Sequence, residues 1–245
     1  MAGKMFEVKA LLFDVFGTVV DWRTGIARDV KVIADKHNIP INPDDFADSW
    51  RAEYQPAMEE IRQGRRGFTI LDKLHLENLK KIAPRYNLDN LSNEEYNFLV
   101  TAWHRLPGWS DSSEGLNKLK KKFILATQSN GNIALMVNMA KYSSLNWDVI
   151  LGAEVVGHYK PEPEAYQKAC SALNLKTTEC LMVAAHDDDL KAARLQGMKT
   201  AYVHRPLEYG REKLFDLAEV DDYKGDRDWD VVSADFHDLA NQLGC

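Results

Sequence analysis

An aspartate stands directly after an apolar run near the start of the chain. Asp14 follows Ala-Leu-Leu-Phe at positions 10–13, and Gly17 comes three residues later. A continuous apolar run is typical of a parallel strand buried on both faces, and a glycine lets the backbone leave such a strand sharply. Because open α/β sheets bind ligands beyond the carboxyl ends of their strands, we interpret Asp14 as a nucleophile. The alternative is an aspartate that only accepts a hydrogen bond in the turn before Gly17.

Other polar residues follow apolar runs further along the chain, where predicted strands end. Ser129 and Asn130 come after Phe-Ile-Leu-Ala-Thr, and Lys160 lies in a proline-containing segment after the next apolar run. Ser129 and Asn130 can bind an anion at a helix N-terminus, or simply cap that helix. Lys160 would keep a nearby Asp14 ionised, whereas an exposed loop lysine is the ordinary alternative.

A histidine and an aspartate three residues apart follow a further apolar run. His186 and Asp189 come after Cys-Leu-Met-Val-Ala-Ala. Their spacing permits a hydrogen-bonded pair that activates water as a general base. A structural histidine beside a solvated, acidic helix start is the alternative.

Arg51 lies in a helical segment, where most arginines are surface residues. It becomes a candidate anion ligand only if that helix covers the strand ends. Nearby aromatic side chains either line an apolar pocket there or belong to the core. These are Phe16, Trp22, Trp50 and Tyr54.

The predicted elements place these residues at one edge of a sheet. After position 109 helical segments alternate with apolar runs, which predicts strands at 123–127, 149–153, 180–185, 200–204 and 231–232. This alternation predicts an α/β fold with a doubly wound, Rossmann-like parallel sheet. Between 22 and 108 the apolar periodicity is helical, including one helix over 44–63. We therefore predict an α/β core domain from residues 1–21 and 109–245 and an inserted helical cap domain from residues 22–108.

Composition narrows the class of protein. The 245 residues are 45% hydrophobic and 28% charged with a net charge of −6, which argues against a nucleic-acid partner. No run has the length of a membrane span and no signal peptide is recognised, so we expect no membrane partner and a cytoplasmic location. The acidic, glycine-containing stretch 220–230 is predicted to form an exposed loop. Three widely spaced cysteines favour neither a disulfide framework nor a zinc site. The apolar stripes of the helical cap favour a homodimer.

Over nearly its whole length the chain resembles the haloacid dehalogenase superfamily, and more closely its L-2-haloacid dehalogenase (type II) branch. The matching segments are FDVFGTVVD, SWR, ATQSNGN, YKPEPEAY and MVAAHDDDLKAARLQGMKTAYV. The resemblance implies that Asp14 displaces the halogen of a short 2-haloacid to form an aspartyl ester, which water then hydrolyses to a 2-hydroxyacid. It implies no metal and no other cofactor, and a small-molecule haloacid as substrate.

The resemblance also assigns roles to the other candidates. Arg51, with Asn130 nearby, would receive the departing halide, and Ser129 with backbone N–H groups after the nucleophile would hold the substrate carboxylate. Phe16 would contact the substrate. The residues that order the nucleophile and the hydrolytic water would be Thr18, Lys160 and Asp189.

Some residues depart from the patterns of the superfamily. Its phosphatases carry an acid where this sequence has Phe16 and a magnesium ligand where it has Ala185, whereas a halide leaves without protonation. Well-known dehalogenases carry Ser and Asn at the positions of Ala184 and His186, and Tyr at that of Phe16. We infer that His186 replaces the amide and activates water with Asp189. The rival hypotheses are a magnesium-dependent phosphatase and a catalytically idle binding protein.

Overall fold

The fold is that of a computed structural model that describes residues 8–211 and 227–245. Within these residues, strands form one five-stranded sheet in which every pairing is parallel. In their order across the sheet, the strands are β2 (Ile124–Thr127), β1 (Ala10–Phe13), β3 (Cys180–Ala184), β4 (Lys199–Val203) and β5 (Val231–Ser233). The predicted α/β fold with a doubly wound parallel sheet is confirmed. Most of the predicted loop at 220–230 lies outside the described residues.

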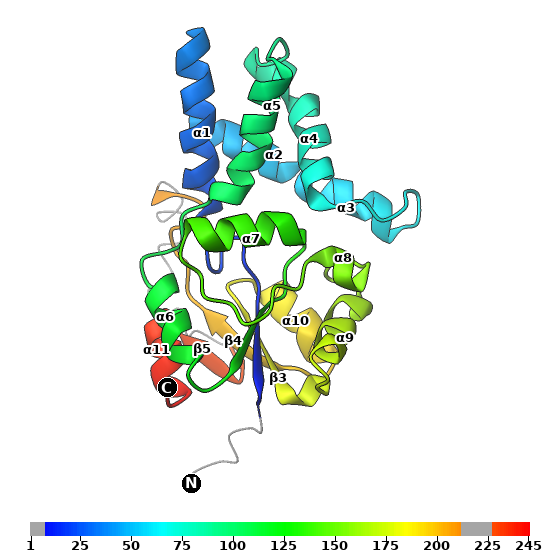
Figure 1. Cartoon of the computed structure of the whole chain (residues 1–245), viewed down its shortest axis with the longest axis vertical. Coiled ribbons are helices and arrows are strands. Elements are labelled where there is room, and N and C mark those ends of the chain that lie inside the picture. The colour runs from blue at the N-terminus through cyan, green and yellow to red at the C-terminus, as the bar shows by residue number, and fades with distance from the viewer. Residues whose placement is uncertain (1–7, 212–226) are drawn as a thin grey trace.

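Helices cover both faces of the sheet (Figure 1). Leu11 and Phe13 belong to an apolar cluster with α6 (Ser112–Leu119) and α11 (Phe236–Gln242), whereas their neighbours in β1, Ala10 and Leu12, belong to a cluster with α9 (Pro163–Ala172) and α10 (Asp187–Leu195). This alternation follows from the two-residue period of a strand, and burial on both faces explains why β1 is apolar throughout.

Helices fill the chain between β1 and α6. Figure 1 shows them gathered at one end of the molecule, beyond the sheet. They are α1 (Trp22–His37), α2 (Pro43–Ala52), α3 (Tyr54–Arg62), α4 (Leu71–Ile82), η1 (Ala83–Tyr86), α5 (Asn93–Val100) and η2 (Thr101–Arg105). We call this segment the helical insert. It shares an apolar cluster with the sheet, since Phe13 and Trp103 belong to the same buried group. The division into a core (1–21 and 109–245) and a cap (22–108) stays a prediction.

The helix predicted over 44–63 is interrupted at Glu53, between α2 and α3. Pro56 lacks the N–H that a continuous helix would direct at the carbonyl of Ala52, so the break before it has a local cause. The carbonyl of Glu53 accepts from the N–H of Ala57 at 3.2 Å and from the Asn78 side chain at 3.1 Å. The break reorients α3, whose first residue is Tyr54.

The strand predicted at 149–153 is wrong. Val149 forms an isolated parallel bridge with Ala126, and α8 (Ala153–Val156) already begins at the end of the predicted range. The cause is the side chain of Thr127, which takes the place of a neighbouring strand's backbone. Its hydroxyl accepts from the N–H of Leu151 and donates to the carbonyl of Leu151. The remaining elements are α7 (Ile133–Tyr142) and η3 (Thr177–Glu179).

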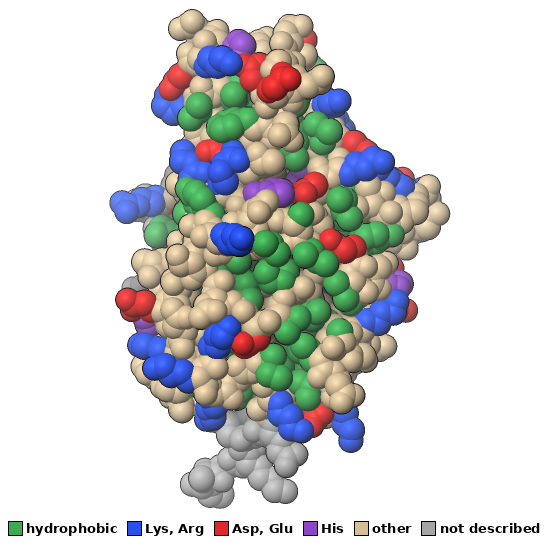
Figure 2. All heavy atoms as spheres, viewed as in Figure 1, with side chains coloured by type: hydrophobic (Ala, Val, Ile, Leu, Met, Phe, Trp, Pro, Cys, Tyr) green, Lys and Arg blue, Asp and Glu red, His purple; other side chains and the backbone are tan. Residues whose placement is uncertain are grey.

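The surface offers one apolar area in the view of Figure 2, over the middle of the face that carries α7. Large exposed hydrophobic side chains of α7 and α8 include Ile133, Tyr142 and Val155. Among the described helices, none combines the length and apolarity that a membrane crossing requires. Cys170 and Cys180 are buried free thiols and Cys245 is an exposed one.

Candidate active site

Asp14 lies at the carboxyl edge of the sheet, directly after β1. Its N–H donates to the carbonyl of Val183 at 3.0 Å, so the backbone that carries the carboxylate is anchored to β3. Gly17 then adopts a φ of +84°, which turns the chain back towards the site. This turn lets the hydroxyl of Thr18 donate to Oδ2 of Asp14 at 2.7 Å while it accepts from the N–H of Ala185 at 2.9 Å.

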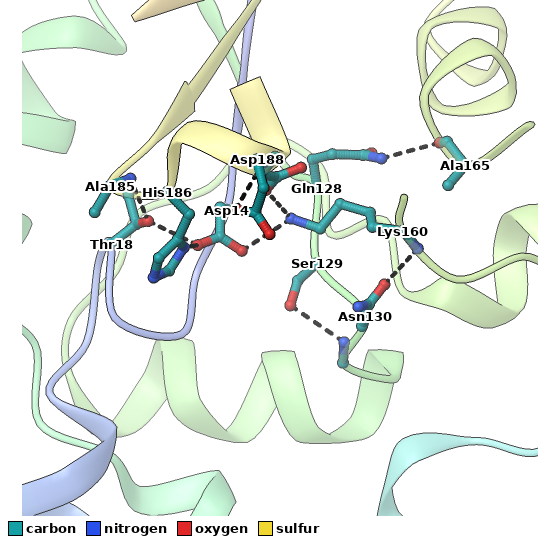
Figure 3. A network of polar contacts seen from close by, with 12 residues as sticks. Asp14, Thr18, Gln128, Ser129, Asn130, Lys160, Ala165, Ala185, His186 and Asp188 are labelled. Atoms are coloured by element: carbon teal, nitrogen blue, oxygen red, sulfur yellow. Dashed lines mark hydrogen bonds and ion pairs between the residues drawn. The ribbon is translucent and has the colours of Figure 1, made fainter. Parts of the chain in front are cut away.

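Lys160 connects Asp14 with a second carboxylate. Its ammonium contacts Oδ1 of Asp14 at 2.9 Å and also donates to Oδ2 of Asp189. The hydroxyl of Tyr166 donates to the other oxygen of Asp189 at 2.6 Å. Asn130 holds the lysine backbone, because its Oδ1 accepts from the N–H of Lys160 at 2.8 Å. Figure 3 shows Lys160 and His186 reaching Asp14 from opposite sides.

His186 does not form the predicted pair with Asp189. Its Nδ1 lies 3.1 Å from Oδ2 of Asp14, and its Nε2 lies 3.0 Å from both carboxylate oxygens of Glu208. Asp189 instead binds Lys160 and Tyr166. The reason is geometric: His186 precedes the first turn of α10 in extended conformation, whereas Asp189 lies within that turn.

Glu208, like Tyr166, is a site residue that the sequence patterns did not predict. It lies five residues beyond β4, in a loop, and the residue is 3% exposed. The indole of Trp22 donates to its Oε1 at 3.1 Å. A Cβ on Gly17 would lie only 2.1 Å from the same oxygen, so glycine makes room for this buried carboxylate. The sequence offered one signal for Glu208, because it follows the predicted strand at 200–204. No spacing in the sequence indicates that it pairs with His186.

Asp14 is held in its ionised form. Burial acts to raise its pKa, but the charge of Lys160 and the contacts with His186 outweigh this and hold the pKa well below its usual range. Asp189 behaves oppositely, since burial and the charge of Asp14 raise its pKa against the effects of Lys160 and Tyr166. Burial opposes the charge of Lys160, but both carboxylates raise its pKa. These shifts assign the stable negative charge to Asp14.

The pKa of His186 also depends on its partners. Burial acts to lower its pKa, but the hydrogen bonds with Asp14 and Glu208 and their charges raise the pKa well above its ordinary value. The imidazole lies between two carboxylates, which favour its protonated form. The removal of either negative charge would lower its pKa again.

Arg51 is held by aromatic rings. Its guanidinium carbon lies 4.0 Å from the ring centroid of Tyr54, 5.4 Å from that of Trp22 and 5.7 Å from that of Phe16. Its Nη1 is buried and has no hydrogen-bond partner among the described residues. Ring faces fix a guanidinium without occupying its N–H groups, so Arg51 can donate to an anion in the cavity.

A cavity of about 560 Å³ joins these residues. Its lining includes Asp14, Phe16, Arg51, Asn130, Lys160, His186 and Asp189. Of the aromatic side chains considered in the sequence, Phe16 and Tyr54 line the cavity, whereas Trp50 belongs to the core. Ser129 is not among the lining residues, and its hydroxyl accepts from the N–H of Gly131 at 3.1 Å (Figure 3). Except for Ser129 and Thr18, every predicted site residue lines this cavity. Thr18 does not line it but binds Asp14.

The residues around Asp14 fit a divalent cation poorly. Magnesium requires several oxygen ligands, yet the ammonium of Lys160 already lies between Asp14 and Asp189. Ala185 supplies no side-chain oxygen at the neighbouring strand end. Within residues 8–211 and 227–245, no three His, Cys, Asp or Glu side chains gather in a way that could hold a metal ion.

Comparisons with known proteins agree on one family. The family model described as haloacid dehalogenase-like hydrolase matches residues 8–197. (S)-2-haloacid dehalogenase 4A of Burkholderia cepacia is 28% identical over 220 residues, which cover 83% of this chain and 87% of the relative. Pyrophosphatase PpaX of Bacillus cereus (strain Q1) is 32% identical over 219 residues, 85% of this chain and 88% of the relative.

Similarity to a solved structure is higher. The crystal structure of a defluorinating L-2-haloacid dehalogenase superimposes with a TM-score of 0.91 at 43% sequence identity. The match covers 97% of this chain and 96% of that chain.

Proposed function

Since the chain belongs to the haloacid dehalogenase-like hydrolase family, we propose that it converts short 2-haloacids to 2-hydroxyacids through an ester on Asp14. One observation carries the proposal: an ionised, buried carboxylate faces a cavity in which Arg51 offers N–H groups to an anion. A nucleophile and an anion acceptor in one cavity are what displacement of a halide requires. The defluorinating dehalogenase at 43% identity supports this assignment.

The first step forms the ester. A carboxylate oxygen of Asp14 attacks the carbon that bears the halogen, and the carbon–halogen electron pair leaves with the halide. Lys160 and Thr18 hold the carboxylate during attack, each through a hydrogen bond to a different oxygen. Arg51 and Asn130 receive the halide, and donors placed where charge develops lower the barrier.

The second step uses the dependence of His186 on its partners. Esterification removes the charge of Asp14, so the pKa of His186 falls and the imidazole releases its proton to solvent. Neutral His186, oriented by Glu208, then takes a proton from water, and the resulting hydroxide attacks the ester carbonyl carbon. The remaining water proton passes from the new carboxyl group to the product alkoxide. This restores ionised Asp14 and protonated His186.

The roles of the remaining residues stay predictions from the sequence. Ser129, together with backbone N–H groups after Asp14, would bind the substrate carboxylate; its hydroxyl oxygen already accepts from Gly131. Asp189 would position water, and it accepts a hydrogen bond from Lys160, which also binds Asp14. Phe16 would form an apolar wall. The cytoplasmic location and the homodimer also remain predictions. The apolar area over α7 and α8 is a candidate surface for the homodimer.

The deciding experiment measures halide release from chloroacetate and 2-chloropropionate, with and without EDTA. We expect EDTA-resistant release that Asp14→Asn abolishes. The similarity to pyrophosphatase PpaX makes a magnesium-dependent phosphatase the rival. That rival predicts no halide release and an EDTA-sensitive hydrolysis of small phosphate esters, although Phe16 and Ala185 stand where such phosphatases carry an acid and a magnesium ligand. An idle binding protein would show no turnover that Asp14→Asn changes.

The ester itself can be tested with labelled water. In a single turnover in H₂¹⁸O, with enzyme in excess, the proposed route leaves the label in Asp14 and an unlabelled hydroxyl group in the product. Direct attack of water on the substrate would place the label in the product and would overturn the ester mechanism.

A further inference from the structure

The hydroxyl of Tyr54 lies beside the proposed halide ligands. Tyr54 begins α3, directly after the break at Glu53, and its side chain lines the cavity although the residue is only 5% exposed. Its ring supports the guanidinium of Arg51 at 4.0 Å. Asn130 lines the same cavity. Tyr54 therefore shares this cavity with both residues to which we assign the departing halide.

The hydrogen bond between Asn130 and Lys160 determines which way the Asn130 amide faces. Oδ1 of Asn130 accepts from the backbone N–H of Lys160 at 2.8 Å, and because a backbone N–H can only donate, this fixes the orientation of the amide. The amide nitrogen is then the group that can donate to a halide in the cavity. Because Tyr54 lines the same cavity and its ring lies against Arg51, its hydroxyl can also donate to an anion bound there.

We propose that Tyr54 donates its hydroxyl hydrogen bond to the departing halide and thereby favours the smaller halogens. The inference rests on the proposed function, in which Asp14 displaces a halide towards Arg51 and Asn130. The proton stays on Tyr54: as the carbon–halogen bond breaks and the ester bond forms, the halide accepts hydrogen bonds from the phenol, the guanidinium and the amide.

The size of the halide decides how much this donor contributes. A small halide concentrates its charge and accepts a strong hydrogen bond, whereas bromide spreads its charge over a larger volume. Arg51 is itself held by the Tyr54 ring, but a phenylalanine ring would hold it as well. The hydroxyl and the ring thus have separable roles, and Tyr54→Phe removes only the hydroxyl.

The test compares single-turnover ester formation with fluoroacetate, chloroacetate and bromoacetate. Loss of one donor to a developing anion costs about 10²-fold to 10³-fold in rate. We expect Tyr54→Phe to slow the chloroacetate reaction by about 10²-fold and the bromoacetate reaction by about tenfold, so the ratio of the two rates falls. Any fluoride release by the wild type should be lost first. Inhibition of turnover by added fluoride should weaken more than inhibition by bromide.

Tyr159→Phe is the matched control. Its buried hydroxyl donates to the carbonyl of Thr69 at 2.5 Å, and Tyr159 is not among the residues that line the cavity. Loss of that bond should lower thermal stability and leave the chloride-to-bromide rate ratio unchanged. An unchanged ratio in Tyr54→Phe, with either equal losses or no loss, would overturn the inference. The proposed function fails separately, through absence of halide release by the wild-type protein.

Discussion

Both carboxylate oxygens of Glu208 lie 3.0 Å from Nε2 of His186, so the imidazole has a fixed orientation before any substrate binds. Its other nitrogen faces Oδ2 of Asp14, next to the ester carbonyl carbon that water must attack. The pair is suited to the second half-reaction, because esterification removes one carboxylate partner and leaves the other.

Substitution of His186 should therefore separate the two half-reactions. In His186→Ala we expect ester formation to continue and ester hydrolysis to slow by about 10²-fold to 10⁴-fold, the contribution of a positioned general base. Halide should appear as a burst equal to the enzyme concentration, and mass spectrometry should detect the ester on Asp14. Glu208→Gln should give the same pattern more weakly, and the exposed Glu60→Gln should not. If formation and breakdown both keep the wild-type rate, the role is wrong.

The pH dependence of ester hydrolysis should report the same histidine. In the free protein the pKa of His186 is raised well above its ordinary value by Asp14 and Glu208 against burial. The ester removes the charge of Asp14, so hydrolysis should accelerate with pH along a limb whose midpoint lies below the pKa in the free protein. Single-turnover hydrolysis rates measure this limb. A limb that survives in His186→Asn belongs to another group and contradicts the assignment.

The raised pKa of His186 also makes a prediction about stability. A raised folded-state pKa contributes free energy of unfolding that is fully present below the unfolded value, about pH 6.5, and is lost as pH rises through the folded value. Urea unfolding of the wild type should therefore show a loss of stability with rising pH above about pH 6.5. His186→Asn should lack this component, so the stability difference between the two proteins should be largest at the acidic end. A constant difference across this range would contradict a raised pKa of His186.

Removal of Lys160 should affect both folding and ester formation. The variant Lys160→Met leaves Asp14 and Asp189 buried without their shared cation, and such a broken pair costs about 3–5 kcal/mol. The pKa of Asp14 should rise, because the charge of Lys160 is the largest influence that lowers it. We expect ester formation to be lost at neutral pH. Lys191→Met, on an exposed lysine of α10, is the control. An active Lys160→Met would contradict the role of the lysine.

The sequence predicted which residues reach the sheet edge better than it predicted their partners. Asp14, Lys160 and His186 could be located because apolar runs and prolines mark where the chain reaches that edge, and these are local signals. Glu208 could not be paired with His186, since the two are 22 positions apart and the chain between them includes a helix, a strand and a loop. Only the packed loop brings the carboxylate against Gly17.

Local patterns also failed where a single side chain replaced a regular hydrogen bond. Thr127 satisfies both backbone groups of Leu151, which ends the predicted strand at 149–153 after one bridge. Pro56 divides the predicted helix over 44–63, and the break at Glu53 places Tyr54 at the start of a new helix that faces the cavity. Helical periodicity located the aromatic residues but not the direction of α3.

The last prediction concerns the contact between the helical insert and the site. Nη1 of Arg62, in α3, donates to the carbonyl of Lys160 at 3.0 Å, while its Nε binds Glu59 at 2.8 Å. The side chain thus crosses from the insert to the backbone that carries the lysine, and it lines the cavity. In Arg62→Ala we expect KM for chloroacetate to rise several-fold, since α3 loses its hold on Lys160. Ester formation at saturation should change less.

Arg65→Ala supplies the control for Arg62. Arg65 lies three residues after Arg62, but its side chain pairs with Glu60 on the surface. The two variants remove the same charge, so a general electrostatic attraction of the anionic substrate would raise KM alike in both. A rise confined to Arg62→Ala assigns the effect to the bond with Lys160, because only that arginine connects the insert to the residue that holds Asp14. Equal KM values in the two variants would contradict this.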